Sequence, residues 1–239
     1  MKTPEQTLAP GVRLHAFTDA GTLAETLADR VADRLRQAVR ERERALLVVS
    51  GGRTPTAFLG ALSDRPLPWP QVDIVPADER WVPAGSEERN SRLIRDCLLQ
   101  GQAAAACLHE LIAGGAESPP EAAAEASGRL AGLVWPADAV ILGMGEDGHT
   151  ASLFPDAPEL AVGLAPAAPL VVTMTPASRP EPRLSLSAET LAAASLNALL
   201  LEGEDKRLAL EQALADPKAI FDRPIRYFLS RPLEVFWSP

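Results

Sequence analysis

Short apolar runs alternate with helix-length segments along this chain, and that alternation limits the possible folds more than any other feature. Three of the apolar runs, each with the length of a buried strand, lie at 45–49, 72–75 and 139–142. Within 23–39, leucine or valine recurs every four residues, which is typical of an amphipathic helix, here beginning at Asp19 or Thr22. Strands that alternate with helices form βαβ units with right-handed crossovers. The pattern predicts one Rossmann-like α/β domain over 1–239, with a mostly parallel sheet and helices on both faces.

The remaining elements are predicted from the same patterns. Further strands are expected near 12–17, 108–112, 170–174, 184–187, 197–201, 225–229 and 233–237. Further helices are expected to begin near Thr54 and Thr150 and to cover 90–99, 119–133 and 204–214. Residues 100–107 are expected to form a loop, and the alanine- and proline-rich stretch 156–169 is expected to be a mobile loop beside the site.

Composition excludes several classes of protein. With 46% hydrophobic and 23% charged residues, the 239-residue chain has an ordinary globular composition. Its net charge of -9 argues against nucleic acid or an anionic membrane surface as a partner. Residues 1–20 contain no apolar core of signal-peptide length, and no apolar run approaches a membrane span. We expect a cytoplasmic protein, and the sequence is compatible with either a monomer or a weak dimer.

The cysteines and histidines do not form a recognised cofactor motif. Cys97 and Cys107 match no metal or redox spacing and are expected to be free thiols in a reducing compartment. Three histidines, His15, His109 and His149, are scattered along the chain, so no metal and no other cofactor is predicted. His15 and His109 are expected to be structural, because neither lies in a glycine-rich loop at a strand end.

The loop after the apolar run 139–142 is the strongest candidate for chemistry. It begins Gly143-Met-Gly-Glu-Asp-Gly and reaches His149 two residues after Asp147. In open α/β sheets, ligands bind beyond the carboxyl ends of strands, and glycine lets the backbone approach a ligand closely. Imidazole is the side chain best suited to move protons near neutral pH. By itself, however, such a loop is a weak motif that often only connects two elements.

A second candidate loop, Ser50-Gly51-Gly52-Arg53-Thr54, follows the apolar run 45–49. Thr54 is a good helix N-cap and the next residue is proline, so a helix should begin there. A helix N-terminus after a glycine-rich turn offers free N–H groups and a positive dipole end to an anion, and arginine adds a phosphate-binding fork. The sequence is not a Walker loop, and a plain strand-to-helix turn is an equally good interpretation of the three residues Ser-Gly-Gly.

A third candidate stretch, Asp78-Glu79-Arg80, follows the apolar run 72–75. Successive residues of an extended segment point to opposite sides, so Asp78 and Arg80 should face one way and Glu79 the other. An acid and a guanidinium side by side are suited to a polar ligand. They are also compatible with a surface ion pair of little energetic consequence.

Taken in order, these stretches closely resemble the 6-phosphogluconolactonase family, within the wider group of sugar-phosphate isomerases and glucosamine-6-phosphate deaminases. The resemblance includes Ser86 and Asn90 and continues through 179–186 and 203–206, so it covers nearly the whole chain. At its C-terminal end, 236–239, the chain departs from the family pattern. The resemblance implies a sugar-phosphate isomerase-like fold and hydrolysis of 6-phospho-D-glucono-1,5-lactone, a phosphorylated sugar lactone of the oxidative pentose phosphate pathway.

The same resemblance implies a role for each matching residue. His149 would be the general base that activates water, oriented by Asp147, whereas Arg80 would bind the oxyanion or the phosphate and Asp78 would position Arg80 or bind hydroxyls. The implied phosphate site consists of Ser50, Gly51, Gly52, Arg53 and Thr54, helped by Arg80, Arg183 and Lys206. Arg179, although in a family-like setting, is expected to be a surface residue.

Two alternative functions stay open from the sequence. A glucosamine-6-phosphate deaminase-like isomerase is disfavoured by two differences. That group has a tyrosine at the position of Arg80, and after its histidine it has a glutamate-containing sequence in place of residues 150–155. The missing glutamate matters, since ring opening and isomerisation need carboxylates that shuttle protons. A non-catalytic sugar-phosphate sensor is the other alternative. Asp147 and His149 argue against it, because binding phosphate requires neither.

Overall fold

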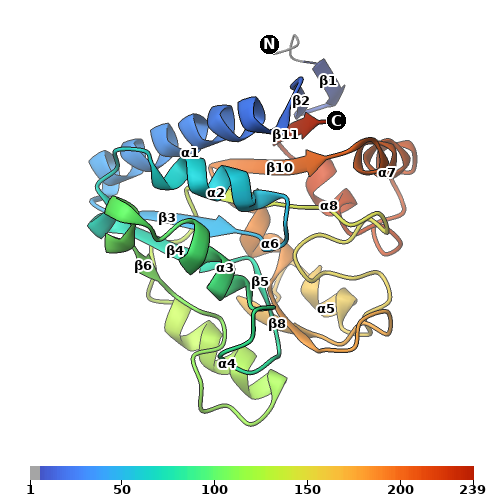
Figure 1. Ribbon diagram of the computed structural model, residues 1–239. Helices are drawn as coiled ribbons and strands as arrows, with labels where there is room; N and C mark the ends of the chain where they lie inside the picture. Colours follow the sequence, from blue (N-terminus) through green and yellow to red (C-terminus); the bar gives the residue numbers. More distant parts are fainter. Residues whose placement is uncertain (1–5) are drawn as a thin grey trace.

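The computed structural model describes residues 6–239, and within these residues two sheets organise the chain (Figure 1). The main sheet has the order β1-β2-β11-β10-β7-β3-β4-β6. Its strands are β1 Gln6–Ala9, β2 Val12–Ala16, β3 Ala45–Val49, β4 Val72–Pro76, β6 Cys107–Leu108, β7 Ala139–Leu142, β10 Leu196–Glu202 and β11 Leu233–Ser238. All neighbours pair in parallel except β1 and β2. The predicted α/β fold with a mostly parallel sheet is confirmed.

The small sheet is antiparallel and has the order β5-β9-β8. Its strands are β5 Asp78–Arg80, β8 Val171–Met174 and β9 Arg183–Leu186. It joins the main sheet where β4 ends, because the N–H of Leu186 donates to the carbonyl of Ala77 at 2.9 Å. The third candidate stretch of the sequence, Asp78-Glu79-Arg80, therefore leads directly from one sheet into the other.

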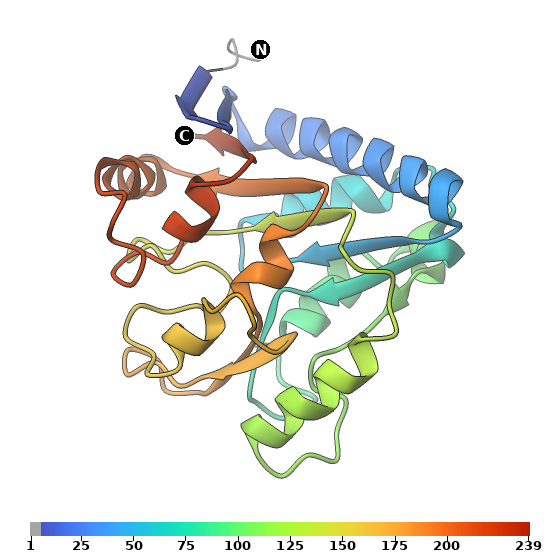
Figure 2. The same cartoon turned by 180° about the vertical axis from the view of Figure 1, so that it is seen from behind.

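Helices cover both faces of the main sheet, as Figures 1 and 2 show. The helices are α1 Ala20–Arg42, α2 Pro55–Ser63, α3 Asn90–Cys97, α4 Pro119–Leu130, α5 Leu160–Gly163, α6 Ala188–Ala192, α7 Glu204–Ala215 and α8 Arg226–Leu229. Short 3₁₀ helices occupy Trp69–Gln71 and Gly101–Ala105. In Figure 2, the green α4 and the gold α5 lie on the opposite side of the main sheet from the blue α1.

Alternate residues of the central strands supply the two halves of the core. Leu47 and Val49 of β3 pack in the cluster that contains the apolar side chains of α1, α2 and α3. Leu46 and Val48 belong to the cluster that contains the small sheet, α4 and α7. A parallel sheet covered on both faces needs apolar residues at every position, which is why these strands read as continuous apolar runs.

Helix α1 begins at one of the two predicted residues. The carboxylate of Asp19 accepts a hydrogen bond from the N–H of Thr22 at 2.7 Å, which is the arrangement of an N-cap. The helix ends where Glu43 adopts a left-handed backbone with φ 63°. Its buried face carries the four-residue repeat seen in the sequence, including Leu23, Leu27 and Leu35.

The order of the strands creates a switch point between β3 and β7. From β3 the chain moves outward through β4 to β6, and it then returns to β7 on the other side of β3 and continues through β10 to β11. The loops that follow β3 and β7 therefore leave the sheet in different directions. In open α/β sheets, such a crevice beyond the carboxyl ends of the strands is where ligands bind.

Several predicted elements are wrong. Residues 225–229 are expected as a strand, but α8 covers 226–229 and Ile225 is its N-cap residue, since Pro224 begins a turn in which its carbonyl accepts the N–H of Tyr227. A short apolar run does not distinguish a buried strand from a buried helical turn. Strand β6 covers only Cys107–Leu108 of the region expected near 108–112, and the expected loop 100–107 contains a 3₁₀ helix.

The helix expected from Thr150 is also wrong. The hydroxyl of Thr150 donates to the carbonyl of Gly143 at 2.8 Å, Ala151 has a positive φ of 48°, and Thr150 forms an isolated bridge with Leu153. Side-chain bonds from threonine to the backbone compete with helix formation. Regular helix occurs only further on, as α5 inside 156–169. The mobility expected of that stretch stays a prediction.

Candidate active site

The loop after β3 brings the backbone close to the first residue of α3. The N–H of Ser50 donates to the carbonyl of Ile141 at 2.9 Å, so the loop continues the pairing of β3 with β7. A Cβ atom on Gly51 would lie 1.8 Å from Oδ1 of Asn90, so no other residue fits there without displacing that side chain. Gly52 has a φ of +97°, which favours glycine. Both glycines of this loop are therefore required by its geometry.

Thr54 precedes α2 as predicted, but it does not cap the helix. Its backbone is already in the αR conformation and its side chain makes no capping hydrogen bond. An N-cap side chain reaches the helix N–H groups from an extended backbone, which Thr54 lacks. Pro55 occupies the first helical position, as the sequence indicates. The loop from Ser50 to Thr54 still faces the same cleft as the other candidate residues.

Strand β5 points Asp78 and Arg80 into the cleft and Glu79 away from it, as the alternation predicts. Arg80 lies directly opposite Arg183 in the antiparallel pairing of β5 with β9. Burial, followed by the charge of Arg80, lowers the pKa of the Arg183 guanidinium, whose side chain is only 8% exposed. Like charges directly across a strand pair destabilise it. Two adjacent guanidiniums in a cleft are therefore well suited to an anion.

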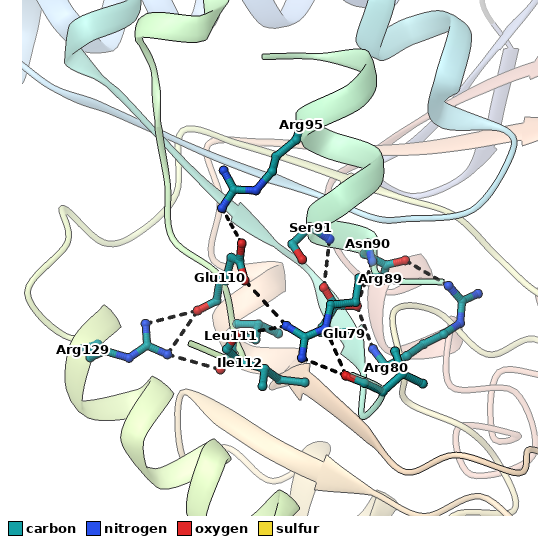
Figure 3. Close-up of polar contacts among 11 residues, drawn as sticks. Glu79, Arg80, Arg89, Asn90, Ser91, Arg95, Glu110, Leu111, Ile112 and Arg129 are labelled. Atoms are coloured by element: carbon teal, nitrogen blue, oxygen red, sulfur yellow. Dashed lines mark hydrogen bonds and ion pairs between the residues drawn. The ribbon is translucent and has the colours of Figure 1, made fainter. Parts of the chain in front are cut away.

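Glu79 joins β5 to the start of α3, as Figure 3 shows. Its fully buried carboxylate accepts hydrogen bonds from the backbone N–H groups of Asn90 and Ser91, both at 2.8 Å, and of Arg80 at 2.9 Å. The side chain of Asn90 donates to the carbonyl of Asp78 at 2.8 Å and accepts from Arg80 at 3.4 Å. Glu79, which faces away from the cleft, thus holds Arg80 and Asn90, which line it.

Asp78 is held by two residues for which no role is predicted from the sequence. The hydroxyl of Ser152 donates to Oδ2 of Asp78 at 2.5 Å, and the amide of Asn90 lies 3.2 Å from Oδ1. Burial raises the pKa of Asp78 above its usual value, although the hydrogen bond from Ser152 and the charge of Arg80 oppose that rise. No sequence spacing connects Ser152 with Asp78, because the two meet only through folding.

His149 and Asp147 form a bonded pair in the loop after β7. Nδ1 of His149 lies 2.6 Å from Oδ1 of Asp147, which leaves Nε2 for the cleft, and the ring stacks on Phe154 with centroids 4.2 Å apart. Burial alone would raise the pKa of Asp147, but the hydrogen bond and charge of His149 outweigh it and bring the pKa to about 2. A Cβ on Gly145 would lie 2.1 Å from Nδ1, so this glycine makes room for the pair.

Two further cations reach the cleft from other elements. Lys206, in the first turn of α7, is partly buried, and its Nζ lies 3.8 Å from the carboxylate of Glu146. Arg179 is exposed as predicted, but it also lines the cleft, where its guanidinium lies 5.3 Å from the centre of the Phe154 ring. The expectation that Arg179 is only a surface residue is therefore corrected.

The cleft has a volume of about 380 Å³ and lies beyond the carboxyl ends of β3, β7 and β10. All the predicted binding and catalytic residues line it except Asp147, which lies behind His149. Its charged lining residues are Arg53, Asp78, Arg80, Arg179, Arg183, Glu202 and Lys206. This lining is cationic although the chain as a whole is acidic, so it can bind a small anion beside an imidazole.

Outside the cleft, three possible metal ligands lie close together in space. The sequence analysis predicts no metal because the histidines are scattered along the chain, and this group contradicts that reason. Asp73, Cys107 and His109 place their ligand atoms within 4.8 Å of one another. No sequence motif indicates this group, because Asp73 comes from β4, Cys107 from β6, and His109 from the position just after β6.

The fold and the cleft define a class of α/β proteins with a cationic cleft at the switch point of the sheet. The model of the glucosamine-6-phosphate isomerases/6-phosphogluconolactonase family matches residues 18–237. A 6-phosphogluconolactonase of Mesorhizobium japonicum is 46% identical over 98% of this chain and 99% of its own length. One of Pseudomonas aeruginosa is 43% identical over the whole of both chains.

Solved structures give the same assignment. The crystal structure of a 6-phosphogluconolactonase from Shewanella baltica superposes with a TM-score of 0.91 at 37% identity, covering 95% of this chain and 97% of that one. The chain therefore belongs to the 6-phosphogluconolactonase family, within the wider glucosamine-6-phosphate isomerase group. Among residues 6–239, no helix has the length and apolar character needed to cross a membrane.

Proposed function

We propose that this protein hydrolyses 6-phospho-D-glucono-1,5-lactone to 6-phospho-D-gluconate, with His149 as the general base. The observation that carries the proposal is the bond between Nδ1 of His149 and the carboxylate of Asp147, in a histidine that lines a cationic cleft. Because Nδ1 is bonded, Nε2 is the ring nitrogen that remains to accept a proton. The names of the relatives at 43–46% identity support the lactone as the substrate. No comparable observation favours the isomerase or the sensor.

In the proposed mechanism, a water molecule attacks the lactone carbonyl carbon while Nε2 of His149 accepts one of its protons. Asp147 fixes the tautomer of the imidazole and stabilises its protonated form, which is the role of the acid in a catalytic triad. The tetrahedral intermediate collapses with cleavage of the bond to the ring oxygen, and His149 returns the proton to that oxygen. The product is the open-chain acid, which ionises in water.

The oxyanion of the intermediate needs a donor, and Arg80 is the candidate. It lies beside Asp78, whose half-buried carboxylate is held by Ser152 and Asn90. One well-placed donor of this kind contributes roughly 3 kcal/mol to lowering a barrier. In the proposal Asp78 positions Arg80 or binds sugar hydroxyls.

The phosphate would bind at the other side of the cleft. The proposed site consists of the Ser50–Thr54 loop together with Arg183 and Lys206. It combines backbone N–H groups at a helix N-terminus with cationic side chains, two features that bind phosphate. The partly buried Lys206 lies in the first turn of α7, where the helix dipole disfavours a cation, so a bound anion gives it a reason to be there. We place the enzyme in the cytoplasm, with which the free thiols of Cys97 and Cys107 are compatible.

The test follows acid release from freshly generated 6-phosphogluconolactone by wild type, His149→Ala and a no-enzyme control. Wild type should accelerate hydrolysis strongly, and the variant should lose roughly 10²–10⁴-fold in kcat, the usual contribution of a general base. Binding of 6-phosphogluconate, measured by calorimetry, should persist in the variant because the phosphate site is intact.

The possible outcomes separate the parts of the proposal. A wild type no faster than buffer would remove the lactonase function. An active His149→Ala enzyme would keep the function but remove His149 as the base and direct attention to Asp78. Loss of both catalysis and 6-phosphogluconate binding would show that the substitution disrupts the cleft rather than the chemistry.

A further inference from the structure

The group formed by Asp73, Cys107 and His109 lies at the edge of the main sheet, away from the cleft. Asp73 of β4 is the direct neighbour of Cys107 of β6 in the parallel pairing. His109 follows two residues later, and its N–H donates to the carbonyl of Ile74 at 2.8 Å, so the backbone continues along β4 beyond β6. Residues two apart on an extended segment point to the same side. Cys107 and His109 therefore both reach Asp73, and none of the three lines the cleft.

We propose that Asp73, Cys107 and His109 form a binding site for a single zinc-like divalent cation, independent of the catalytic cleft. The three ligand atoms lie within 4.8 Å of one another. Thiolate, imidazole and carboxylate are the ligands that Zn²⁺ takes in proteins. A thiolate and an imidazole together select zinc over Mg²⁺ or Ca²⁺, which prefer oxygen ligands.

The contacts of His109 and Asp73 show where the cation would lie. Nε2 of His109 is 2.8 Å from Oδ1 of Asp73, so a shared proton now occupies the space between them. Ligands of a tetrahedral zinc ion lie roughly 3.3–3.8 Å apart, given bonds of about 2.0–2.3 Å. The cation would replace that proton, and the two side chains would separate by less than about 1 Å. Cys107 is exposed, so its thiol is free to rotate toward the same point.

Arg44 supports the carboxylate from outside the group. It donates to Oδ2 of Asp73 at 2.8 Å through Nε and to Oδ1 at 2.7 Å through Nη2. A carboxylate offers about four lone-pair positions, so the one facing His109 stays available to a metal. Outer partners of this kind orient ligating carboxylates in metal sites. The side chain of Asp73 is only 4% exposed, so its oxygens are held in place.

The consequence of binding would be structural. β6 is the last strand in the order of the main sheet and covers only Cys107–Leu108. A cation joining Cys107 and His109 to Asp73 would hold this edge to β4. Because the site binds the folded chain, it would raise the melting temperature by mass action without changing the rate of lactone hydrolysis.

The experiment titrates Co²⁺, which gives visible and thiolate charge-transfer absorption in zinc sites, into the reduced, chelator-treated full chain. Matched variants are available because Cys97 is the only other cysteine: Cys107→Ser and His109→Gln remove ligands, whereas Cys97→Ser is the control. Wild type and Cys97→Ser should bind one Co²⁺ per chain with a thiolate band that Zn²⁺ displaces. Cys107→Ser should lose the band, and His109→Gln should weaken binding at least ~10-fold.

Hydrolysis rates equal to wild type verify that each variant is folded, since neither Cys107 nor His109 lines the cleft. A wild type without a thiolate band would overturn the proposal, and so would a band that survives in Cys107→Ser. Equal loss of the band in Cys97→Ser and Cys107→Ser would also overturn it, because the metal would then bridge thiols instead of binding this group.

Discussion

At the scale of single residues, the arrangement of the cleft depends on Glu79, which does not face it. Burial raises the pKa of this carboxylate even though three backbone N–H groups donate to it. Replacing it with glutamine keeps the shape but turns one accepting oxygen into an NH₂ group. One buried N–H at the start of α3 would then lack an acceptor, and Arg80 and Asn90 would lose their common anchor.

We therefore predict that Glu79→Gln lowers the free energy of unfolding by about 1–3 kcal/mol, the cost of an unsatisfied buried polar group. The KM for the lactone should rise as well, because Arg80 lies in the cleft. Urea unfolding and initial-rate measurements test both effects. Glu88→Gln is the matched control, since Glu88 is an exposed glutamate of the same segment. Equal stability and kinetics in the two variants would contradict the prediction.

How far single residues could be predicted depends on whether their signal is local. His149, Arg80 and the glycines of the Ser50–Thr54 loop were recognisable because each lies a few residues after an apolar run that predicts a strand. Ser152 was not, because its bond to Asp78 joins positions that only the fold brings together. The same holds for the Asp73 group, whose members come from two strands. The roles given to the cleft residues stay predictions until they are tested.

At the scale of elements, an acidic residue of β11 connects helix α1 to the edge of the sheet. Glu234 lies 3.3 Å from Nε2 of His15 in β2 and 2.7 Å from Nη2 of Arg30 in α1. The contact with His15 lowers the pKa of Glu234 to about 2. The charge of Arg30 acts in the same direction, whereas burial opposes the shift. This contact agrees with the expectation that His15 is structural.

The lowered pKa predicts how stability depends on pH. An acid whose folded pKa lies below its unfolded value stabilises the protein above the unfolded pKa, near 4.5, and loses that contribution as pH falls toward about 2. Glu234→Gln should therefore be less stable than wild type by ~2–3 kcal/mol at pH 6–7, and the difference should shrink between about pH 4.5 and 2. Denaturant unfolding of both proteins at several pH values measures it. A difference that does not change with pH would contradict the prediction.

Elements were predictable where the apolar pattern is uninterrupted or clearly periodic, and the prediction failed where the pattern is mixed. The four-residue repeat located α1 with its N-cap, and the apolar runs located β3, β4 and β7. At 225–229 the apolar side chains are interrupted by Arg226 and show no clear period, and the preceding proline favours a helical turn. At Thr150 a side-chain bond to the backbone outweighed helix propensity. The secondary structure of segments without a clear pattern therefore depends on contacts that the local apolar pattern does not reveal.

At the scale of the whole molecule, the strand order explains why three separate loops form one cleft. The alternation of strands and helices predicts a parallel sheet, but not that β7 returns beside β3 or that β5 leaves for a second sheet. These two facts bring the histidine loop, the Ser50–Thr54 loop and Arg80 together. The spacing of residues within one motif does not predict that the three loops meet. The resemblance to the family does predict it, because the order of the motifs along the chain carries information about the whole fold.

The single-domain organisation predicted from the sequence leads to a test of cooperativity. Leu184 and Leu186 of the small sheet pack in the same core cluster as Val48 and Val75 of the main sheet, and Leu186 also hydrogen-bonds to the end of β4. A shared core should make both sheets unfold together in one cooperative transition. Such two-state unfolding is usual for domains of fewer than about 150 residues, so it is a stringent test for this longer chain. We expect one calorimetric transition with equal calorimetric and van't Hoff enthalpies, and coincident unfolding by far-UV circular dichroism and tryptophan fluorescence.

A ligand sharpens this test, because the proposed cleft has walls from both sheets. Saturating 6-phosphogluconate at 100 times its Kd should stabilise the folded chain by ~2.7 kcal/mol and move the single transition as a whole. If the small sheet instead unfolded separately, two transitions would appear. The ligand would then shift the first of them, since loss of β5 and β9 removes Arg80 and Arg183 from the cleft. Such a split would contradict the single domain without affecting the assignment to the family.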